Sequence, residues 1–380
     1  MKKILAVILV VILVISIVFL LYKAYPFHNA NQSGNNAINS VNESDISDVI
    51  SDIPNQNMAN TEILFLVPLT NTEIKLYSVS VDGKNLKEIL TLDKSEFKNT
   101  NTYGNYFDSL ALKGDIFTDG TTISYIKNNI DKFKYFLTNY PLYAFSNNFC
   151  AYSTPISTSD TVSGGACFKG VYLYNMSTGT AIQIDKMLDG KLPNSSFSKD
   201  GNLFITSLSF SQDGKFLFVV SYPDDEISVF SLKQMKFIGT FQPNIQHVWH
   251  VDKVENSLYF LAGTDTSNVY QFDIDTKSLK AITNCTESSF VISPDGQNLV
   301  FIEAYVDEKN DLGILDLKNG NIKKINYQKG EKEVAGFVVD SRHLIVKRLY
   351  KVSDTDPYPH VDIYLLNLNT LKQAKLYSQQ

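Results

Sequence analysis

The sequence predicts an all-β fold, a β-propeller of about seven four-stranded blades, and the period of its repeat also fits six or eight blades. The first observation is a phrase in residues 210–230, where a strand end, a Ser-X-Asp-Gly turn and an aromatic, β-branched strand follow one another. The phrase returns in residues 292–301 and, without its glycine, in residues 337–346. Each copy predicts two strands joined by a tight turn.

The second observation is a closing phrase, in which an apolar strand ends in Asp or Asn, turns, and is followed by a further strand. Its copies occupy residues 171–184, 269–282, 312–325 and 363–376. The closing residues Ile238, Ile282, Ile325 and Leu376 are separated by 44, 43 and 51 residues. These separations are close to the roughly 40–50-residue period of a four-stranded propeller blade.

The turn residues of the first phrase have a structural explanation. Ser and Asp side chains bond to nearby backbone amides, and Gly adopts the positive φ that closes such a turn. We therefore assign a structural role, without catalysis, to Ser211, Asp213, Gly214, Ser293, Asp295 and Gly296.

Residues 1–23 are predicted to form an uncleaved N-terminal transmembrane anchor. Residues 4–22 are apolar apart from Ser16, and as a helix they would measure about 28 Å, close to the roughly 30 Å core of a bilayer. A cleaved signal peptide usually has a shorter apolar run and a small-X-small site, which the residues after Tyr22 do not provide. Because Lys2 and Lys3 favour the cytoplasm, we expect a single-pass protein of the cell membrane with a cytoplasmic N-terminus and an extracytoplasmic propeller.

Residues 24–60 are rich in Asn, Ser and Asp and are predicted to be a flexible linker. One pattern within them allows an alternative. Ile46, Val49, Ile50 and Ile53 have helical spacing and follow Asp45 as a candidate N-cap, which indicates either residual helicity or a short helix that docks on the domain or on a partner.

The propeller is expected to occupy residues 61–380. Residues 62–68, 73–81 and 86–90 predict three strands of the first blade, and its fourth could come from the segment before Thr61. Residues 116–125 are interpreted as another turn between strands, and residues 132–139 as a strand. Further strands are expected within residues 143–152, 166–184, 204–241, 246–282, 288–325 and 334–376.

This pattern resembles the WD-like repeat of TolB-type β-propellers. The resemblance rests on SxDGxxLxF, a further strand and an Asp/Asn-turn-strand, and it is best over residues 210–376. Two departures limit it: Trp249 is the single Trp, so no Trp-Asp dipeptide exists, and a membrane anchor stands where TolB has an amino-terminal α/β domain. The resemblance implies a propeller, and a role in an envelope complex follows from it only by analogy.

Residues 246–252 (QHVWHVD) form the most polar candidate for an innermost strand. Strand alternation would place His250 and Asp252 on one face and His247 and Trp249 on the other. A His and a carboxylate two residues apart could act as base and orienter in catalysis. The alternative is a hydrogen-bonded strand with Trp249 packed between blades. His250 and Asp252 are therefore weak catalytic candidates.

Cysteine content gives one further candidate. Cys150 and Cys167 flank a Ser/Thr/Gly-rich loop and could form a disulfide across adjacent strands in an oxidising compartment, or remain free thiols. Cys285 has no obvious partner. The three cysteines show no C-x-x-C metal spacing, so we expect no metal site and no cofactor.

Composition limits the functional classes. An apolar content of 44%, with 24 Phe and 21 Tyr, suits a β-rich core. The net charge of −6 provides no basic stripe, so no nucleic-acid partner is expected. The chain contains no GxSxG, HExxH, GxGxxG or P-loop motif.

Two functional hypotheses follow. The first is a membrane-anchored, non-catalytic module that binds a protein or peptide partner on one face of the ring. The second is an enzyme, or a binder of a small ligand or carbohydrate, that uses the axial channel.

Overall fold

The computed structural model describes residues 42–53, 61–97, 99–100, 104–105, 107, 110–111, 115–155, 168–188, 197, 201–263, 267–283, 287–303, 310–327, 331–350 and 358–379. Asn39–Gln380 form one compact unit, and the fold below is that of this unit.

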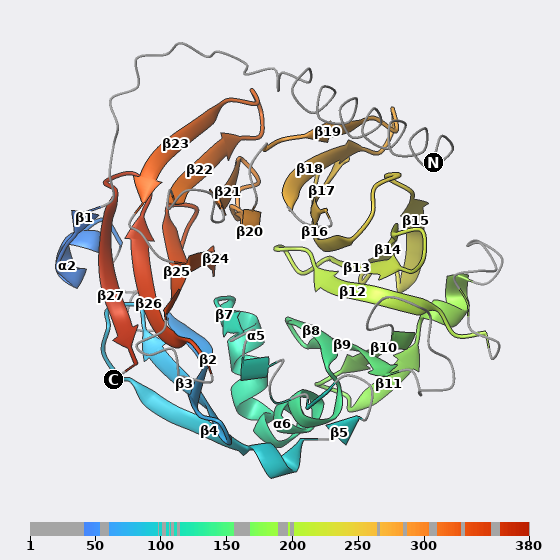
Figure 1. The fold of residues 1–380 in the computed structure, drawn as a ribbon, viewed down its shortest axis with the longest axis horizontal. Coiled ribbons are helices and arrows are strands. Elements are labelled where there is room, and N and C mark those ends of the chain that lie inside the picture. The colour runs from blue at the N-terminus through green and yellow to red at the C-terminus, as the bar shows by residue number, and fades with distance from the viewer. Residues whose placement is uncertain are drawn as a thin grey trace, which may run out of the picture. The chain divides into compact units, whose positions relative to one another are not determined.

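The strands of the described residues form six four-stranded blades around a central axis (Figure 1). From the axis outwards, the first blade contains β7 (Ile116–Phe117), β2 (Glu62–Thr70), β3 (Glu73–Ser80) and β4 (Lys87–Asp93). The second contains β8 (Leu142–Ser146), β9 (Phe149–Pro155), β10 (Phe168–Asn175) and β11 (Thr180–Gln183). The third contains β12 (Phe204–Phe210), β13 (Phe216–Ser221), β14 (Glu226–Ser231) and β15 (Lys236–Phe241).

The fourth blade contains β16 (Val248–Val254), β17 (Ser257–Ala262), β18 (Asn268–Asp273) and β19 (Leu279–Ala281). The fifth contains β20 (Glu287–Ile292), β21 (Asn298–Glu303), β22 (Asn310–Asp316) and β23 (Ile322–Tyr327). The sixth contains β24 (Glu331–Phe337), β25 (His343–Tyr350), β26 (His360–Asn367) and β27 (Lys372–Ser378). The four-stranded antiparallel sheets confirm a propeller, and the six blades lie at the lower end of the range expected from the repeat.

Each blade is apolar on both faces because it packs between two neighbours. In β13, Leu217 and Val219 belong to the core shared with the second blade, whereas Phe218 and Val220 belong to the core shared with the fourth. The described residues contain six such clusters, one for each pair of neighbouring blades. This packing explains why the strands read as continuous apolar runs instead of alternating with polar residues.

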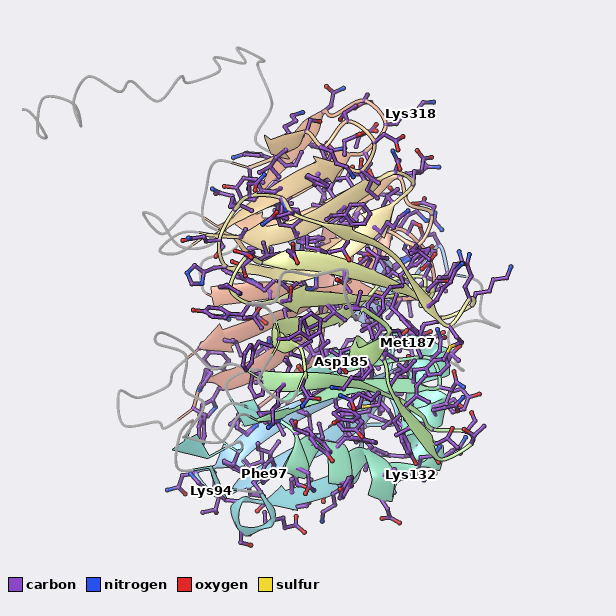
Figure 2. All side chains as sticks on the ribbon, turned by 90° about the vertical axis from the view of Figure 1, so that its right-hand side faces the viewer. Lys94, Phe97, Lys132, Asp185, Met187 and Lys318 are labelled. Atoms are coloured by element: carbon purple, nitrogen blue, oxygen red, sulfur yellow. The ribbon has the colours of Figure 1, made fainter. Side chains whose placement is uncertain are left out.

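The second and third blades are also joined by hydrogen bonds. β10 pairs with β12, which merges the two blades into one sheet. Asp185, which is labelled in Figure 2, lies in the 3-10 helix η3 (Asp185–Leu188) and is fully buried. Its side-chain oxygens accept from the amides of Val171 at 3.0 Å and Leu203 at 3.1 Å, so one buried carboxyl group bonds to both blades.

The first blade takes its innermost strand from downstream in the chain. β7 pairs antiparallel with β2, Phe117 opposite Leu64. The expectation that this strand precedes Thr61 is therefore wrong. The earlier segment instead supplies β1 (Asn42–Glu43), which adds in parallel to β27 at the outer edge of the sixth blade. No strand of the described residues is shared between the first and sixth blades, so this junction closes by side-chain packing.

Two helices replace strands expected between the first and second blades. α5 (Gly120–Asn128) begins where a turn between strands was expected, and α6 (Ile130–Asn139) covers the strand expected at residues 132–139. Both expectations are wrong because the apolar side chains recur at three- and four-residue intervals, which is the helical period. The buried ones are Ile123, Ile126, Phe133, Phe136 and Leu137. Asp119 caps α5 by accepting from the amides of Thr121 and Thr122.

Part of the segment expected to be a flexible linker is docked on the sixth blade. We call residues 42–53 the clasp: they contain β1 and the short helix α2 (Ile46–Val49). Val49, Ile50 and Ile53 are at most 8% exposed and join the core between the sixth and first blades. The docked alternative therefore describes these residues, because their apolar side chains fill the core between the last and the first blade, where the ring closes. Residues 24–41 and 54–60 lie outside the described residues.

No helix within the described ranges is long and apolar enough to cross a bilayer. The anchor expected at residues 1–23 lies outside those ranges and stays a prediction.

Replacing Gly313 by Ala should destabilise the domain by about 1–3 kcal/mol, the usual cost of overfilling a packed core. A Cβ at Gly313 would lie 2.0 Å from Cζ of Phe301, a ring that is fully buried on the neighbouring strand. Urea denaturation of the two proteins measures this difference. Gly120→Ala is the matched control: a Cβ there meets no atom within 4 Å, so its stability should stay within about 0.5 kcal/mol of the parent. Equal midpoints for Gly313→Ala and the parent would contradict the packing described for β22.

Candidate functional site at the axial mouth

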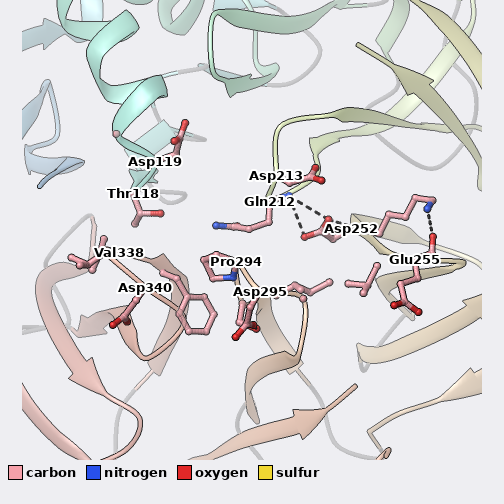
Figure 3. Close-up of a pocket in the computed structure, with 18 residues that line it drawn as sticks. Thr118, Asp119, Gln212, Asp213, Asp252, Glu255, Pro294, Asp295, Val338 and Asp340 are labelled. Atoms are coloured by element: carbon pink, nitrogen blue, oxygen red, sulfur yellow. Dashed lines mark hydrogen bonds between the residues drawn. The ribbon is translucent and has the colours of Figure 1, made fainter. Parts of the chain in front are cut away.

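A cavity of about 450 Å³ opens where the innermost strands of five blades end (Figure 3). Its wall consists of the turns that follow β7, β12, β16, β20 and β24. We call this cavity the axial mouth; its lining is Thr118–Gly120, Gln212–Asp213, Asp252–Glu255, Ile292–Gly296 and Phe337–Asp340. Its volume is in the range of ligand-binding clefts.

The axial mouth is strongly acidic. Six of its lining residues carry a carboxyl group: Asp119, Asp213, Asp252, Glu255, Asp295 and Asp340. Lys253 is the single cationic residue of the lining, and its ammonium donates to the backbone carbonyl of Glu255. A concave surface lined mainly by one sign of charge attracts ligands of the opposite sign.

The Ser-X-Asp-Gly turns form two parts of this wall. Ser211 Oγ donates to Asp213 Oδ1 at 2.7 Å, and the amide of Phe216 donates to Ser211 Oγ at 3.0 Å. Gly214 closes the turn with φ +64°. The turn at Ser293 repeats this geometry, with Oγ donating to Asp295 Oδ1 at 2.5 Å and Gly296 at φ +69°.

These turns also fix the charge of their carboxylates. Burial raises the pKa of Asp213, but hydrogen bonds from Lys215 and Ser211 outweigh it and hold the pKa below its usual value. The pKa of Asp295 is lowered by the same balance between burial and hydrogen bonds from Ser293 and Gln297. Both groups are therefore ionised at neutral pH, so the structural turns also supply the charge of the axial mouth.

The turn of the sixth blade departs from the repeat. It has Ser341 in place of the glycine, and its positive φ of +67° falls instead on Val339, a β-branched residue for which this conformation is strained. Asp340 holds the turn: its carboxylate accepts from the amide of Arg342 at 2.8 Å and contacts Nδ1 of His343 at 2.8 Å. Burial raises the pKa of Asp340, and the hydrogen bonds from Arg342 and His343 lower it below its usual value.

Asp252 has the most perturbed carboxyl group of the axial mouth. It is 7% exposed, and burial raises its pKa to about 7, although the amides of Lys253 and Gln212 donate to it. A carboxyl group that titrates near neutral pH in a cleft is a candidate for binding or acid–base work.

His250 does not share a face with Asp252. Trp249 pairs with Leu261 and Val251 with Phe260, so His250 is an extra residue, a β-bulge with φ +48°. The bulge reverses the alternation after it and places Asp252 on the side of Trp249. The expectation that His250 and Asp252 lie on one face of the strand is therefore wrong, because the bulge interrupts the regular alternation of side chains. Comparable register shifts interrupt β12, β20 and β24.

His250 lines a second cavity of about 300 Å³, between β7, β8 and β12 along the axis. Its Nε2 lies 2.8 Å from the carbonyl oxygen of Phe290 on the next innermost strand. In the same cavity Tyr143 Oη donates to Asp115 at 2.5 Å, and burial and this carboxylate raise the pKa of Tyr143. The structure thus assigns the two candidate residues to neighbouring cavities.

Cys150 is fully buried, and burial raises the pKa of its thiol. Cys167 lies outside the described residues, so the pairing of the two stays a prediction. Within the described ranges, no group of three or more His, Cys, Asp or Glu side chains is arranged to hold a metal ion.

The sequence interpretation did not single out Asp119, Glu255 or Asp340 as site residues. The sequence did contain a pattern that could have identified them: each residue follows the end of an innermost strand, as Asp213 and Asp295 also do. Only the ring shows that these equivalent positions face one cavity.

No protein-family model matches this chain, and no curated protein sequence matches it. Solved structures similar to it include TolB from Acinetobacter baumannii, with 13% identity and a TM-score of 0.44 over 83% of this chain and 63% of that chain. Hydrazine synthase from Kuenenia stuttgartiensis has 14% identity and a TM-score of 0.41 over 62% and 65%. A chain of a nidogen/laminin complex has 10% identity and a TM-score of 0.42 over 84% and 100%. Similarities of this size carry no argument about function.

Replacing Asp252 by Asn should increase stability above neutral pH and have little effect in mild acid. The raised pKa means that the folded state favours the protonated form, so stability is lost as pH rises from about 4 towards 7. An uncharged Asn avoids this loss, and the gain at pH 8 should be on the order of 2–4 kcal/mol. Denaturation at about pH 5 and pH 8 measures it. Asp213→Asn is the control and should show no such gain, because the pKa of Asp213 is lowered. A gain for Asp252→Asn that is the same at both pH values would contradict the assignment.

Proposed function

We propose that this chain is a membrane-anchored, extracytoplasmic β-propeller that binds a protein or peptide partner without catalysing a reaction. The apolar run of residues 4–22 behind Lys2 and Lys3 supports the anchor and its orientation. The repeat scaffold supports a binding role, since propellers leave one open face at each end of the ring.

The observation that carries the proposal is the acidic axial mouth. Six of the residues that line this cavity of about 450 Å³ carry a carboxyl group and one carries an ammonium group. Two of the carboxylates, Asp213 and Asp340, also pair with Lys215 and Arg342, which lie outside the lining. Asp213 and Asp295 use their Oδ1 atoms to hold their own turns, and their lowered pKa values keep them ionised. The partner that fits is a peptide segment with Lys or Arg side chains, which the carboxylates would attract and bind by charge-assisted hydrogen bonds.

Glu255→Lys should reduce capture of the partner several-fold. Glu255 is exposed at the axial mouth, so its replacement reverses a charge there and leaves the turn hydrogen bonds of the other blades intact. The measurement is cross-linking of the tagged full-length chain in native membranes, with the captured proteins quantified by mass spectrometry. The matched control is Asp275→Lys, which reverses another exposed charge, in the turn between β18 and β19 towards the outer edge of the same blade.

Two results would count against the proposal. If both variants lose the partner equally, the loss is a general effect of charge and does not locate binding at the axial mouth. If the parent captures no protein above background, the chain has no protein partner in these membranes. The same preparation tests the anchor, because a chain held by residues 1–23 stays in the membrane fraction after an alkaline carbonate wash.

Asp252 favours a second function, an enzyme or a binder of a small ligand or carbohydrate that uses the axial channel. A buried carboxyl group with a pKa of about 7 in the wall of a cavity can exchange a proton at neutral pH. His250→Ala combined with Asp252→Ala should then abolish the thermal shift given by any sugar or cation that stabilises the parent. An unchanged shift in the double variant would dismiss these two residues.

A further inference from the structure

The axial mouth has a polar side and an apolar side. In each blade that lines it, a carboxyl residue follows the end of the innermost strand. The residue directly before that carboxyl residue is polar in the first and third blades, where it is Thr118 and Gln212. In the fourth, fifth and sixth blades it is Val254, Pro294 and Val339. We call these three residues the apolar rim, and because their blades are consecutive they form one side of the cavity.

The turns that carry the apolar rim adjoin one another. The amide of Asp295 donates to Ser341 Oγ at 3.2 Å, which joins the turns of the fifth and sixth blades. A Cβ at Gly296 would lie 3.6 Å from Cγ1 of Val254, an ordinary van der Waals distance, so the turns of the fourth and fifth blades are also neighbours. The apolar rim is therefore one continuous surface.

The apolar rim is held in shape by the blades beneath it. Val254 is half-buried and packs against the core between the fourth and fifth blades. Val339 is half-buried and packs against the core between the sixth and first blades. Pro294 is exposed, and its ring fixes its own φ. A surface that is ordered before a ligand arrives loses little entropy when the ligand binds.

The conformation of Val339 indicates that its side chain has a use at the axial mouth. Its φ is +67°, which is strained for a β-branched residue. The turns of the third and fifth blades have their positive φ at glycine instead, at Gly214 and Gly296, so this kind of turn does not require a valine in that conformation. Backbone strain of this type collects at sites that bind ligands.

We propose that the apolar rim makes the axial mouth selective for a segment in which an apolar side chain adjoins the Lys or Arg. The inference rests on the proposed function, because it names which cationic segment the cavity prefers. Glu255 and Asp295 stand directly after rim residues and would bind the cation, whereas Asp340 already pairs with Arg342. The rim would cover the neighbouring apolar side chain and remove it from water.

Fluorescence anisotropy with two labelled hexapeptides tests this selectivity on the full-length chain in nanodiscs of phosphatidylcholine. The first probe is Lys-Ser-Lys-Leu-Ser-Lys, and the second has Ser in place of Leu, so both carry the same charge. The parent should bind the first probe about fivefold more tightly, as expected when a Leu side chain is partly removed from water. Empty nanodiscs give the background of each probe.

Val339→Asn should move the ratio of the two dissociation constants towards one, because Asn tolerates a positive φ but removes apolar surface. Pro294→Ser should do the same from the fifth blade. Met235→Asn is the matched control and should keep the ratio: Met235 is 39% exposed and has φ +51°, but it lies in the turn between β14 and β15, outside the lining of the cavity. Because both constants come from one preparation, a partial loss of folded protein cancels in the ratio.

Equal affinity of the parent for the two probes would overturn this inference alone, since a cationic segment would still bind. A preference that persists in both Val339→Asn and Pro294→Ser would also overturn it. If the parent binds neither probe, this inference and the proposed cationic partner are both wrong.

Discussion

The constraint on which the rest of the structure depends is that each four-stranded blade is apolar on both faces. Such a sheet is stable in water only when both faces are covered. β13 shows the requirement in one strand, since its successive side chains alternate between two different cores. A closed ring covers every blade, whereas a linear stack would leave the outer faces of the first and last blades exposed. The demand for closure therefore makes the junction between the first and sixth blades the critical one.

That junction explains the features in which this chain departs from a regular repeat. The first blade borrows β7 from downstream, and no described strand crosses from one blade to the other. Val49, Ile50 and Ile53 of the clasp supply apolar side chains to the core between them. Asp340 connects this junction with the axial mouth, because the same carboxylate lines the cavity and holds His343 beneath the clasp. The axial mouth and the closure of the ring thus share one residue.

The propeller could be predicted because its turn chemistry is local. Ser211, Asp213 and Gly214 form their turn with bonds among residues 211–216. The closing phrase, whose last residues are 44, 43 and 51 residues apart, indicates the blade length. The helices α5 and α6 were missed although their spacing was visible, since the expected repeat was extended into residues 116–139. The axial mouth was missed for a different reason: its carboxylates belong to turns that are far apart in the chain, and no local pattern says that they converge.

The sequence by itself determined that this chain is a β-propeller with short Ser-X-Asp-Gly turns, because those turns are made by neighbouring residues and each strand carries its own apolar faces. Tertiary structure alone decided the six blades, the origin of β7 and the docking of the clasp, since these depend on which surfaces remain uncovered when the ring closes. It also decided that Asp252 turns away from His250, because the bulge in β16 comes from its pairing with β17. Features that depend on contacts between residues far apart in the chain, such as the closure of the ring, are determined only by tertiary packing.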